Sequence, residues 1–131
     1  MQIGVIGIGR MGGGITRRLC ARGHEVIAFD RDIDQRGMVE SHGAVWADSL
    51  ETLVGLLKEA RRVVWLMLPA GKTTRSVMLE VARLLKANDI VVDGGNSNYK
   101  DSIEADLRLA EMDLAFVDAG TSGGVRGENT G

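Results

Sequence analysis

The start of the chain constrains the fold most, because a glycine motif stands between an apolar run and a helical pattern. The run from Ile3 to Ile8 predicts a short strand that is buried on both faces. It leads into Gly7-Ile8-Gly9-Arg10-Met11-Gly12, a GxGxxG motif, and from Met11 onward apolar residues recur every four positions. The order therefore predicts a strand, a tight turn and a helix that packs back on the strand.

The three glycines of the motif have separate roles in such a turn. Gly7 permits the tight turn, Gly9 lets the backbone approach a pyrophosphate, and Gly12 lets the helix pack close to the sheet. The free N–H groups and the positive dipole end of the helix would then face the phosphates. A glycine turn with a surface aspartate after the next strand is the alternative that the residues leave open.

The rest of the sequence alternates in the same way. Short apolar runs predict further strands at Glu25–Phe29, Ala44–Trp46, Val63–Leu68, Ile90–Val92 and Ala115–Val117. Helices are predicted over Ile33–His42, from Asp48 and Glu51 in capping-box positions through Leu57, over Val77–Leu85, and over Ile103, Leu107 and Ala110. This pattern predicts an α/β fold with one domain over residues 1–131, a Rossmann-type, doubly wound, mainly parallel six-stranded sheet with helices on both faces.

Charge, hydropathy and cysteine content exclude several classes of protein. The formal net charge is −2 and no basic block is present, so nucleic acid is not an expected partner. No apolar run approaches the roughly 20 residues that cross a bilayer, so no membrane contact is expected. Cys20 is the single cysteine, which excludes an intramolecular disulfide and disfavours a thiolate-rich zinc site. We expect a cytoplasmic protein without a metal site.

An acidic residue follows the second predicted strand at the position that matters for a dinucleotide. Asp30 comes 18 residues after Gly12, where a carboxylate can accept hydrogen bonds from the adenine ribose hydroxyls. A carboxylate there repels the 2′-phosphate of NADP and favours NAD. Arg31 follows directly and could instead pair with that phosphate or stack on adenine. The residues therefore favour NAD and leave NADP as the alternative.

Three later stretches lie just beyond the carboxyl ends of predicted strands, where ligands bind in open parallel sheets. They are LMLPAG at 66–71, DGGNSNYKDS at 93–102 and FVDAGTSGGVRG at 116–127. In the second stretch Asn96 presents an amide that both donates and accepts hydrogen bonds. An ordinary turn, with Ser97 or Asn98 capping the next helix, explains that stretch equally well.

Four blocks in this order, GIGRMGG, LPAG, DGGNSNYKDS and FVDAGTSGGVRG, resemble the N-terminal domain of 6-phosphogluconate dehydrogenase, over essentially the whole chain. The resemblance implies oxidation of the C3 hydroxyl of 6-phosphogluconate with hydride transfer to nicotinamide, and then loss of CO₂ to give ribulose 5-phosphate in the pentose phosphate pathway. NADP-using members usually have asparagine at the position of Asp30, so the chain resembles the NAD-preferring branch. The expected partner is thus a sugar-acid phosphate, a small molecule.

The resemblance also implies which residues contact each ligand. The cofactor-binding residues are Gly7, Ile8, Gly9, Arg10, Met11 and Gly12 at the pyrophosphate, Asp30, Arg31 and Asp32 at the adenosine end, Leu68, Pro69 and Ala70 along the cofactor, and Asn96. The substrate-binding residues are Asn96, Ser122, Gly123 and Gly124.

The family's catalytic groups have no counterpart in the sequence. They are a lysine base and a glutamate acid on a helix well beyond the Ser-Gly-Gly loop, which the resemblance places beyond Gly131. No lysine follows Lys100, and Glu128 falls where the family has a loop. We expect the C-terminal helical catalytic and dimerisation domain to be absent, and these residues alone to be inactive. The full-length enzyme is expected to be a homodimer, and the isolated domain is compatible with a monomer.

Two other functions remain open from the sequence. Related β-hydroxyacid dehydrogenases, such as those acting on 3-hydroxyisobutyrate, share the glycine loop and the terminal Ser-Gly-Gly, although they usually have a Ser-Thr-rich block in place of Gly95-Asn96-Ser97. A stand-alone nucleotide-binding module with a regulatory role is the second alternative.

Overall fold

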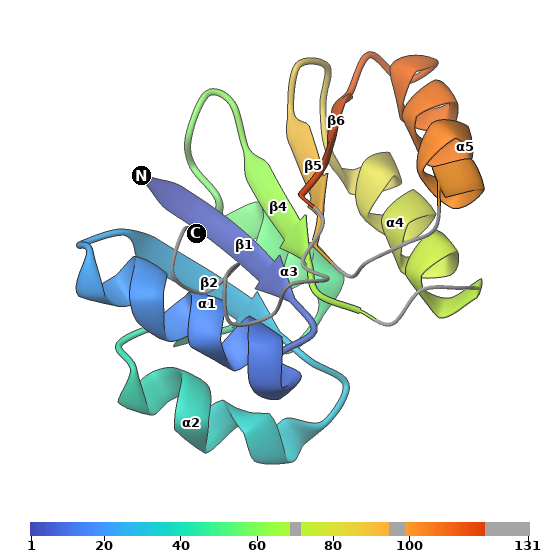
Figure 1. Cartoon of the computed structure of the whole chain (residues 1–131). Helices are drawn as coiled ribbons and strands as arrows, with labels where there is room; N and C mark the ends of the chain where they lie inside the picture. The colour runs from blue at the N-terminus through green and yellow to red at the C-terminus, as the bar shows by residue number, and fades with distance from the viewer. Residues whose placement is uncertain (69–71, 95–98, 120–131) are drawn as a thin grey trace.

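The computed structural model describes residues 1–68, 72–94 and 99–119, which form one parallel sheet with helices on both faces (Figure 1). The strands are β1 (Gln2–Ile6), β2 (Glu25–Phe29), β3 (Val45–Trp46), β4 (Val63–Leu66), β5 (Ile90–Asp93) and β6 (Ala115–Asp118). Their order in the sheet is β3-β2-β1-β4-β5-β6, and every described pair is parallel. This arrangement confirms the predicted doubly wound fold.

The helices connect these strands in the expected places. They are α1 (Gly9–Ala21), the short 3₁₀ helix η1 (Ile33–Gln35), α2 (Arg36–Ser41), α3 (Leu50–Leu56), α4 (Lys72–Leu84) and α5 (Tyr99–Ala110). The single helix predicted over Ile33–His42 is thus η1 followed by α2. Gly23 follows the C-cap residue of α1 and has φ +87°, and its N–H donates to the Cys20 carbonyl at 3.0 Å.

Two apolar layers hold the helices against the sheet, because successive residues of a buried strand point to opposite faces. On one face α1 and α2 pack with Ile15, Leu19 and Val39 on the sheet. On the other face α3, α4 and α5 do so, with Leu53, Val81 and Leu109 fully buried. The central strands β1, β2, β4 and β5 are largely buried on both sides, which explains why they read as continuous apolar runs.

One local prediction was wrong, and the burial of one further helix differs from its apolar spacing. The cap of α3 is Ser49 and not Asp48: Ser49 has an extended backbone, and its Oγ accepts the Thr52 N–H at 3.1 Å. Helix α5 exists as predicted, but Ile103 and Leu107 are 45% and 64% exposed, and the helix is anchored by Leu109 instead. Apolar spacing located this helix correctly, although two of the residues that mark it are exposed.

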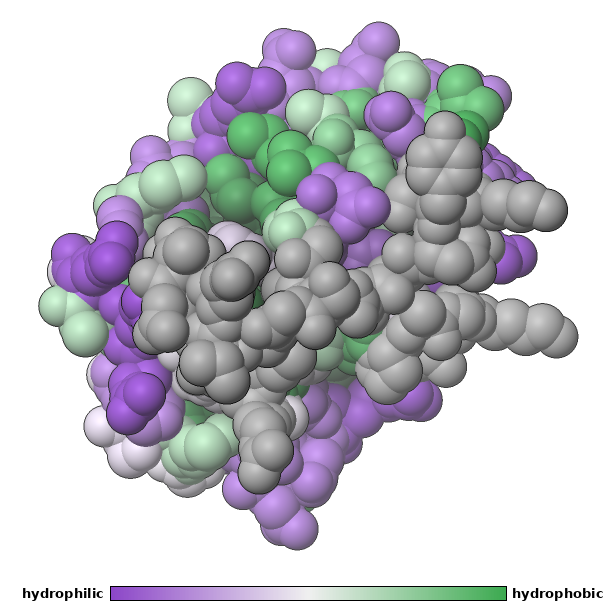
Figure 2. Space-filling view, in the orientation of Figure 1, coloured by the Kyte–Doolittle hydropathy of each residue, from purple (hydrophilic) through white to green (hydrophobic). Residues whose placement is uncertain are grey.

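Figure 2 shows apolar surface over the central strands, on the face of the sheet that α1 and α2 cover in part. Trp65 of β4 and Ile90 of β5 are partly buried on this face, next to the α1 cluster. Val117 of β6 is 47% exposed.

Among the described residues no helix is long and apolar enough to cross a membrane.

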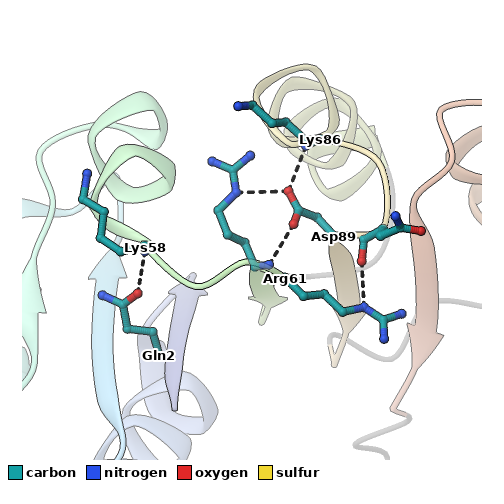
Figure 3. A network of polar contacts seen from close by, with 7 residues as sticks. Gln2, Lys58, Arg61, Lys86 and Asp89 are labelled. Atoms are coloured by element: carbon teal, nitrogen blue, oxygen red, sulfur yellow. Dashed lines mark hydrogen bonds and ion pairs between the residues drawn. The ribbon is translucent and has the colours of Figure 1, made fainter.

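A polar network ties the connections at the amino edge of the sheet (Figure 3). Asp89 is 2% exposed, and its carboxylate accepts the N–H of Lys86 and both the backbone and Nε N–H of Arg62, at 2.7–3.0 Å. Arg61 Nε donates to the Asn88 carbonyl at 2.7 Å, and the Gln2 side chain accepts the Lys58 N–H at 2.6 Å. This edge lies opposite the carboxyl ends of the strands, and its contacts join the segments around the starts of β1, β4 and β5.

Candidate functional site

The candidate site lies at the carboxyl ends of β1, β2 and β4. Strand β1 has β2 on one side and β4 on the other, so the chain leaves the centre of the sheet in opposite directions. A crevice forms at such a switch point. A cavity of about 420 Å³ occurs there, within the range of roughly 300–1,000 Å³ that small-molecule sites occupy.

Three strand ends and one helix line this cavity. The β1 end contributes Ile6 through Gly9, the β2 end Phe29, Asp30 and Arg31, the β4 end Met67 and Leu68, and α4 contributes Val77. The glycine motif and the predicted ribose-binding aspartate therefore open onto the same space. Phe29, Met67 and Val77 were not predicted as lining residues, because their apolar character identifies them equally well as core.

Gly7 makes the turn that starts the site. Its φ is +87°, a conformation that residues with a side chain rarely adopt, and its N–H donates to the Phe29 carbonyl at 3.0 Å. A β-carbon at this position would lie 2.7 Å from both Leu68 Cδ2 and the Met67 carbonyl oxygen. Backbone conformation and close packing both require glycine here.

Gly12 and Gly9 differ in what surrounds them. A β-carbon on Gly12 would collide with the Gly7 carbonyl, so this glycine lets α1 pack against the turn. Gly9 has φ +38°, is exposed, and has no described atom within 4 Å of where its β-carbon would lie. The open space beside Gly9 is where the motif predicts a ligand's phosphates.

The N-terminus of α1 is available to an anion. Ile8 occupies the N-cap, no side chain caps the helix, and the first turn contains no acidic residue. The first N–H groups of an α-helix have no intrahelical partner, and they carry the positive end of the helix dipole. Together with the open Gly9, this arrangement is of the kind that binds phosphate groups at a helix N-terminus.

Asp30 follows β2 and points its carboxylate at the glycine loop. Its Oδ2 accepts the Ile8 N–H at 2.7 Å, and its Oδ1 accepts the Asp32 N–H at 2.8 Å. Arg31 is exposed beside it and lines the cavity. Asp32 caps η1 by accepting the Asp34 N–H at 3.0 Å. The predicted adenosine end is thus a short polar turn next to the loop.

A second cavity of about 440 Å³ adjoins the first and shares Phe29, Arg31 and Val77 with it. Its charged lining contains three carboxylates and two guanidinium groups, namely Asp48, Glu51, Glu80, Arg31 and Arg83. Acidic groups therefore outnumber basic ones beside the predicted adenosine end.

The remaining predicted residues divide into two groups. Leu68 lines the cavity, and Arg10 and Met11 lie in the first turn of α1. The others lie outside the described residues, namely Pro69, Ala70, Asn96, Ser122, Gly123 and Gly124. Gly131 lies outside them as well, so the position of the family's lysine base and glutamate acid beyond this residue stays a prediction.

Neither a metal site nor a reactive thiol is found in the described part of the chain. No cluster of His, Cys, Asp and Glu in these residues could hold a metal. Burial raises the pKa of the Cys20 thiol, so this thiol stays protonated near neutral pH.

Comparison with known families identifies the domain. A sequence model described as the NAD binding domain of 6-phosphogluconate dehydrogenase matches residues 2–131. The chain belongs to this family. Relatives agree with that assignment: the NAD(+)-dependent, decarboxylating 6-phosphogluconate dehydrogenase of Haloferax volcanii is 40% identical over 131 residues. A decarboxylating 6-phosphogluconate dehydrogenase of Staphylococcus aureus is 37% identical over 134 residues.

Solved structures show the same fold as this NAD-binding domain. The 6-phosphogluconate dehydrogenase of Plasmodium falciparum superposes with a TM-score of 0.80 over 88% of the chain, at 22% identity, and 26% of that protein is covered. The 3-hydroxyisobutyrate dehydrogenase of Mycobacterium tuberculosis gives 0.79 at 23% identity, over 88% of the chain and 38% of that protein. At these identities the likeness concerns the fold alone.

The chain spans less than half the length of these relatives. It is covered completely by the Haloferax protein and to 99% by the Staphylococcus protein, but it accounts for only 42% and 28% of their lengths. The shared part is the nucleotide-binding domain.

Proposed function

We propose that the chain binds NAD in the cavity at the end of β1, as the cofactor domain of an NAD-dependent, decarboxylating 6-phosphogluconate dehydrogenase. One observation carries the proposal: the glycine turn and the Asp30 carboxylate face the same cavity, and the Ile8 N–H donates to Asp30 Oδ2 at 2.7 Å. A pyrophosphate loop and a ribose acceptor are thereby adjacent, as a dinucleotide requires.

Different groups of residues would contact different parts of the cofactor. The Gly7–Gly12 turn and the start of α1 would hold the pyrophosphate, and Asp30, Arg31 and Asp32 the adenosine end. Leu68, Pro69, Ala70 and Asn96 would extend along the cofactor towards the nicotinamide. Bound NAD would supply the hydride acceptor.

Charge at the adenosine end supports NAD over NADP. A 2′-phosphate would lie near Asp30 and next to a cavity lined by three carboxylates and two arginines. Like charges at close range oppose binding, and a half-buried position weakens the screening by water. Arg31 is the nearest compensating group, and Asp30 and Asp32 flank it in the sequence.

The substrate and the reaction are part of the same proposal. Asn96, Ser122, Gly123 and Gly124 would hold the sugar acid through amide, hydroxyl and backbone N–H groups. The lysine base and glutamate acid of the family would come from a helical domain outside these 131 residues. The 131 residues would therefore be inactive by themselves. We place the enzyme in the cytoplasm as a homodimer, with 6-phosphogluconate as its substrate.

Calorimetric titration with NAD and NADP tests the cofactor assignment. We expect NAD to bind more tightly than NADP, and the Gly9→Val variant to bind NAD at least about tenfold more weakly, because the new side chain fills the phosphate space and strains the loop backbone at φ +38°. Gly55→Val is the matched control, since Gly55 also has no atom within 4 Å but lies in α3, away from the cavity. A folded wild-type chain that binds no NAD at millimolar concentration would contradict the proposal.

A further inference from the structure

The Asp30 carboxylate already has two hydrogen-bond partners in the protein itself. Oδ2 accepts from Ile8, which is 22 residues away in sequence, and Oδ1 accepts from Asp32. A ribose is the partner usually expected for an acid at this position. In this chain the acid also connects the turn after β2 to the glycine loop after β1.

We propose that Asp30 is a positioning residue that holds the glycine loop in its phosphate-binding shape before any cofactor arrives. This inference rests on the proposed function, since the loop's role is to bind the cofactor pyrophosphate. It goes beyond that function, because it gives Asp30 an effect on the phosphate end of the ligand as well as on the ribose.

The loop needs such a contact because of its glycines. Ile8 stands between Gly7 at φ +87° and Gly9 at φ +38°, and glycine has the largest conformational freedom to lose on ordering. The peptide groups of Ile8 are fixed on both sides: its N–H donates to Asp30, and its carbonyl accepts the Gly13 N–H at 2.8 Å. Loss of the Asp30 acceptor would release one of these two restraints.

A carboxylate suits this position better than an amide. Asp30 meets two N–H donors, and an ionised carboxylate offers two acceptor oxygens with about four lone-pair sites. It can therefore accept both backbone N–H groups and still accept ribose hydroxyls. An asparagine has one acceptor oxygen, so its NH₂ group would face either the Ile8 or the Asp32 donor.

Amide hydrogen exchange in the cofactor-free chain tests the proposal directly. We expect the Ile8 amide to be protected in the wild type and to exchange on the order of tenfold faster in Asp30→Ala, because the acceptor of its N–H is lost. Amides in the middle of α1 should keep their rates, which separates a local effect from unfolding. Asp34→Ala is the control, since Asp34 is an exposed carboxylate two residues beyond Asp32.

Binding of inorganic pyrophosphate separates the positioning role from ribose binding. Pyrophosphate has no ribose, and removal of a negative charge near an anion site should by itself tighten its binding. The positioning role predicts the opposite sign, with about three- to tenfold weaker binding in Asp30→Ala, because the loop is no longer held.

Two results would overturn the inference. One is an Ile8 amide that exchanges at the rate of an open peptide in the wild type, a measurement that needs no variant to fold. The other is unchanged or tighter pyrophosphate binding in a folded Asp30→Ala variant. Neither result depends on NAD affinity, so failure of the inference is distinguishable from failure of the proposed function.

Discussion

Gly12 and Gly55 both lie inside helices, but their surroundings differ. A β-carbon on Gly12 of α1 would collide with the Gly7 carbonyl, whereas one on Gly55 of α3 would meet no atom within 4 Å. Helix propensity treats the two positions alike and favours alanine at both by about 1 kcal/mol. The collision is with backbone, which cannot rotate away as a side chain could.

We therefore predict opposite effects of the same substitution. Gly55→Ala should raise the free energy of unfolding by about 0.5–1 kcal/mol, because the helix loses a flexible residue. Gly12→Ala should lower it by about 1–3 kcal/mol, since α1 must shift away from the β1 turn. Urea denaturation of both variants checks the pair. Stabilisation by both substitutions would mean that α1 does not pack on the Gly7 carbonyl.

At the scale of single elements, the start of α3 shows where sequence spacing is ambiguous. Asp48 with Glu51 and Ser49 with Thr52 have the same three-residue spacing, one position apart. The register is decided by Leu53, Val54 and Leu57, which are all buried, and in that register Ser49 is the residue with its Oγ on the Thr52 N–H. The apolar spacing predicted the helix, but the position of its N-cap depends on how the helix packs in the folded protein.

The observed cap predicts which of two neighbouring residues matters. Ser49→Ala should destabilise the protein by about 1 kcal/mol, because the Thr52 N–H loses its acceptor. Asp48→Ala, one residue earlier and exposed, should change stability by less than about 0.5 kcal/mol. Denaturation midpoints of the two alanine variants give the comparison. A larger loss from Asp48→Ala would place the cap where the sequence first indicated it.

Helix α5 shows a second limit of apolar spacing, which concerns the burial of its residues. Ile103 and Leu107 repeat at helical spacing, as a buried face does, yet both are exposed, while Leu109 is fully buried. Periodicity detects the presence of a helix, but its rotation depends on which side the sheet offers. Helix α5 packs near the edge strand β6, and among its described side chains Leu109 alone is buried, whereas several described side chains of α4 are.

At the scale of the whole molecule, the sequence predicted which residues lie together wherever the strand order alone brings them to one edge of the sheet. Parallel strands bring their carboxyl ends to one edge, so the glycine motif and Asp30 were predicted together at one site and lie together in the structure. The Ile8–Asp30 hydrogen bond was not predictable. It depends on the register of β1 with β2, which only the folded sheet defines.

The amino edge of the sheet is the second feature that the sequence did not indicate. Asp89 reads as a turn residue before β5, but its buried carboxylate bonds Arg62 and the Lys86 N–H. The adjoining Asn88 N–H donates to the Asp113 carbonyl at 2.8 Å, and the Asp89 carbonyl accepts the Ala115 N–H at 3.0 Å. One short segment thus joins the chain entering β4, β5 and β6.

We predict that Asp89→Ala destabilises the whole domain without altering the cofactor site. Removal of the carboxylate leaves the Arg62 guanidinium and two backbone N–H groups without their acceptor, in a position where the ion pair is 14% and 2% exposed. Loss of one partner of such a buried pair costs about 3 kcal/mol, a large part of the roughly 5–15 kcal/mol that stabilises a typical domain. Asp106→Ala, which removes an exposed carboxylate on α5, is the control and should be nearly neutral.

Thermal denaturation and NAD titration together check this prediction. The melting temperature of Asp89→Ala should fall by several degrees, and NAD affinity measured well below that temperature should equal that of the wild type. The two edges of the sheet are separated by the full length of the strands, so the cofactor site should remain intact while the molecule is folded. An unchanged melting temperature would show that the network contributes little to stability. Weaker NAD binding by the folded variant would show that the two edges are energetically coupled.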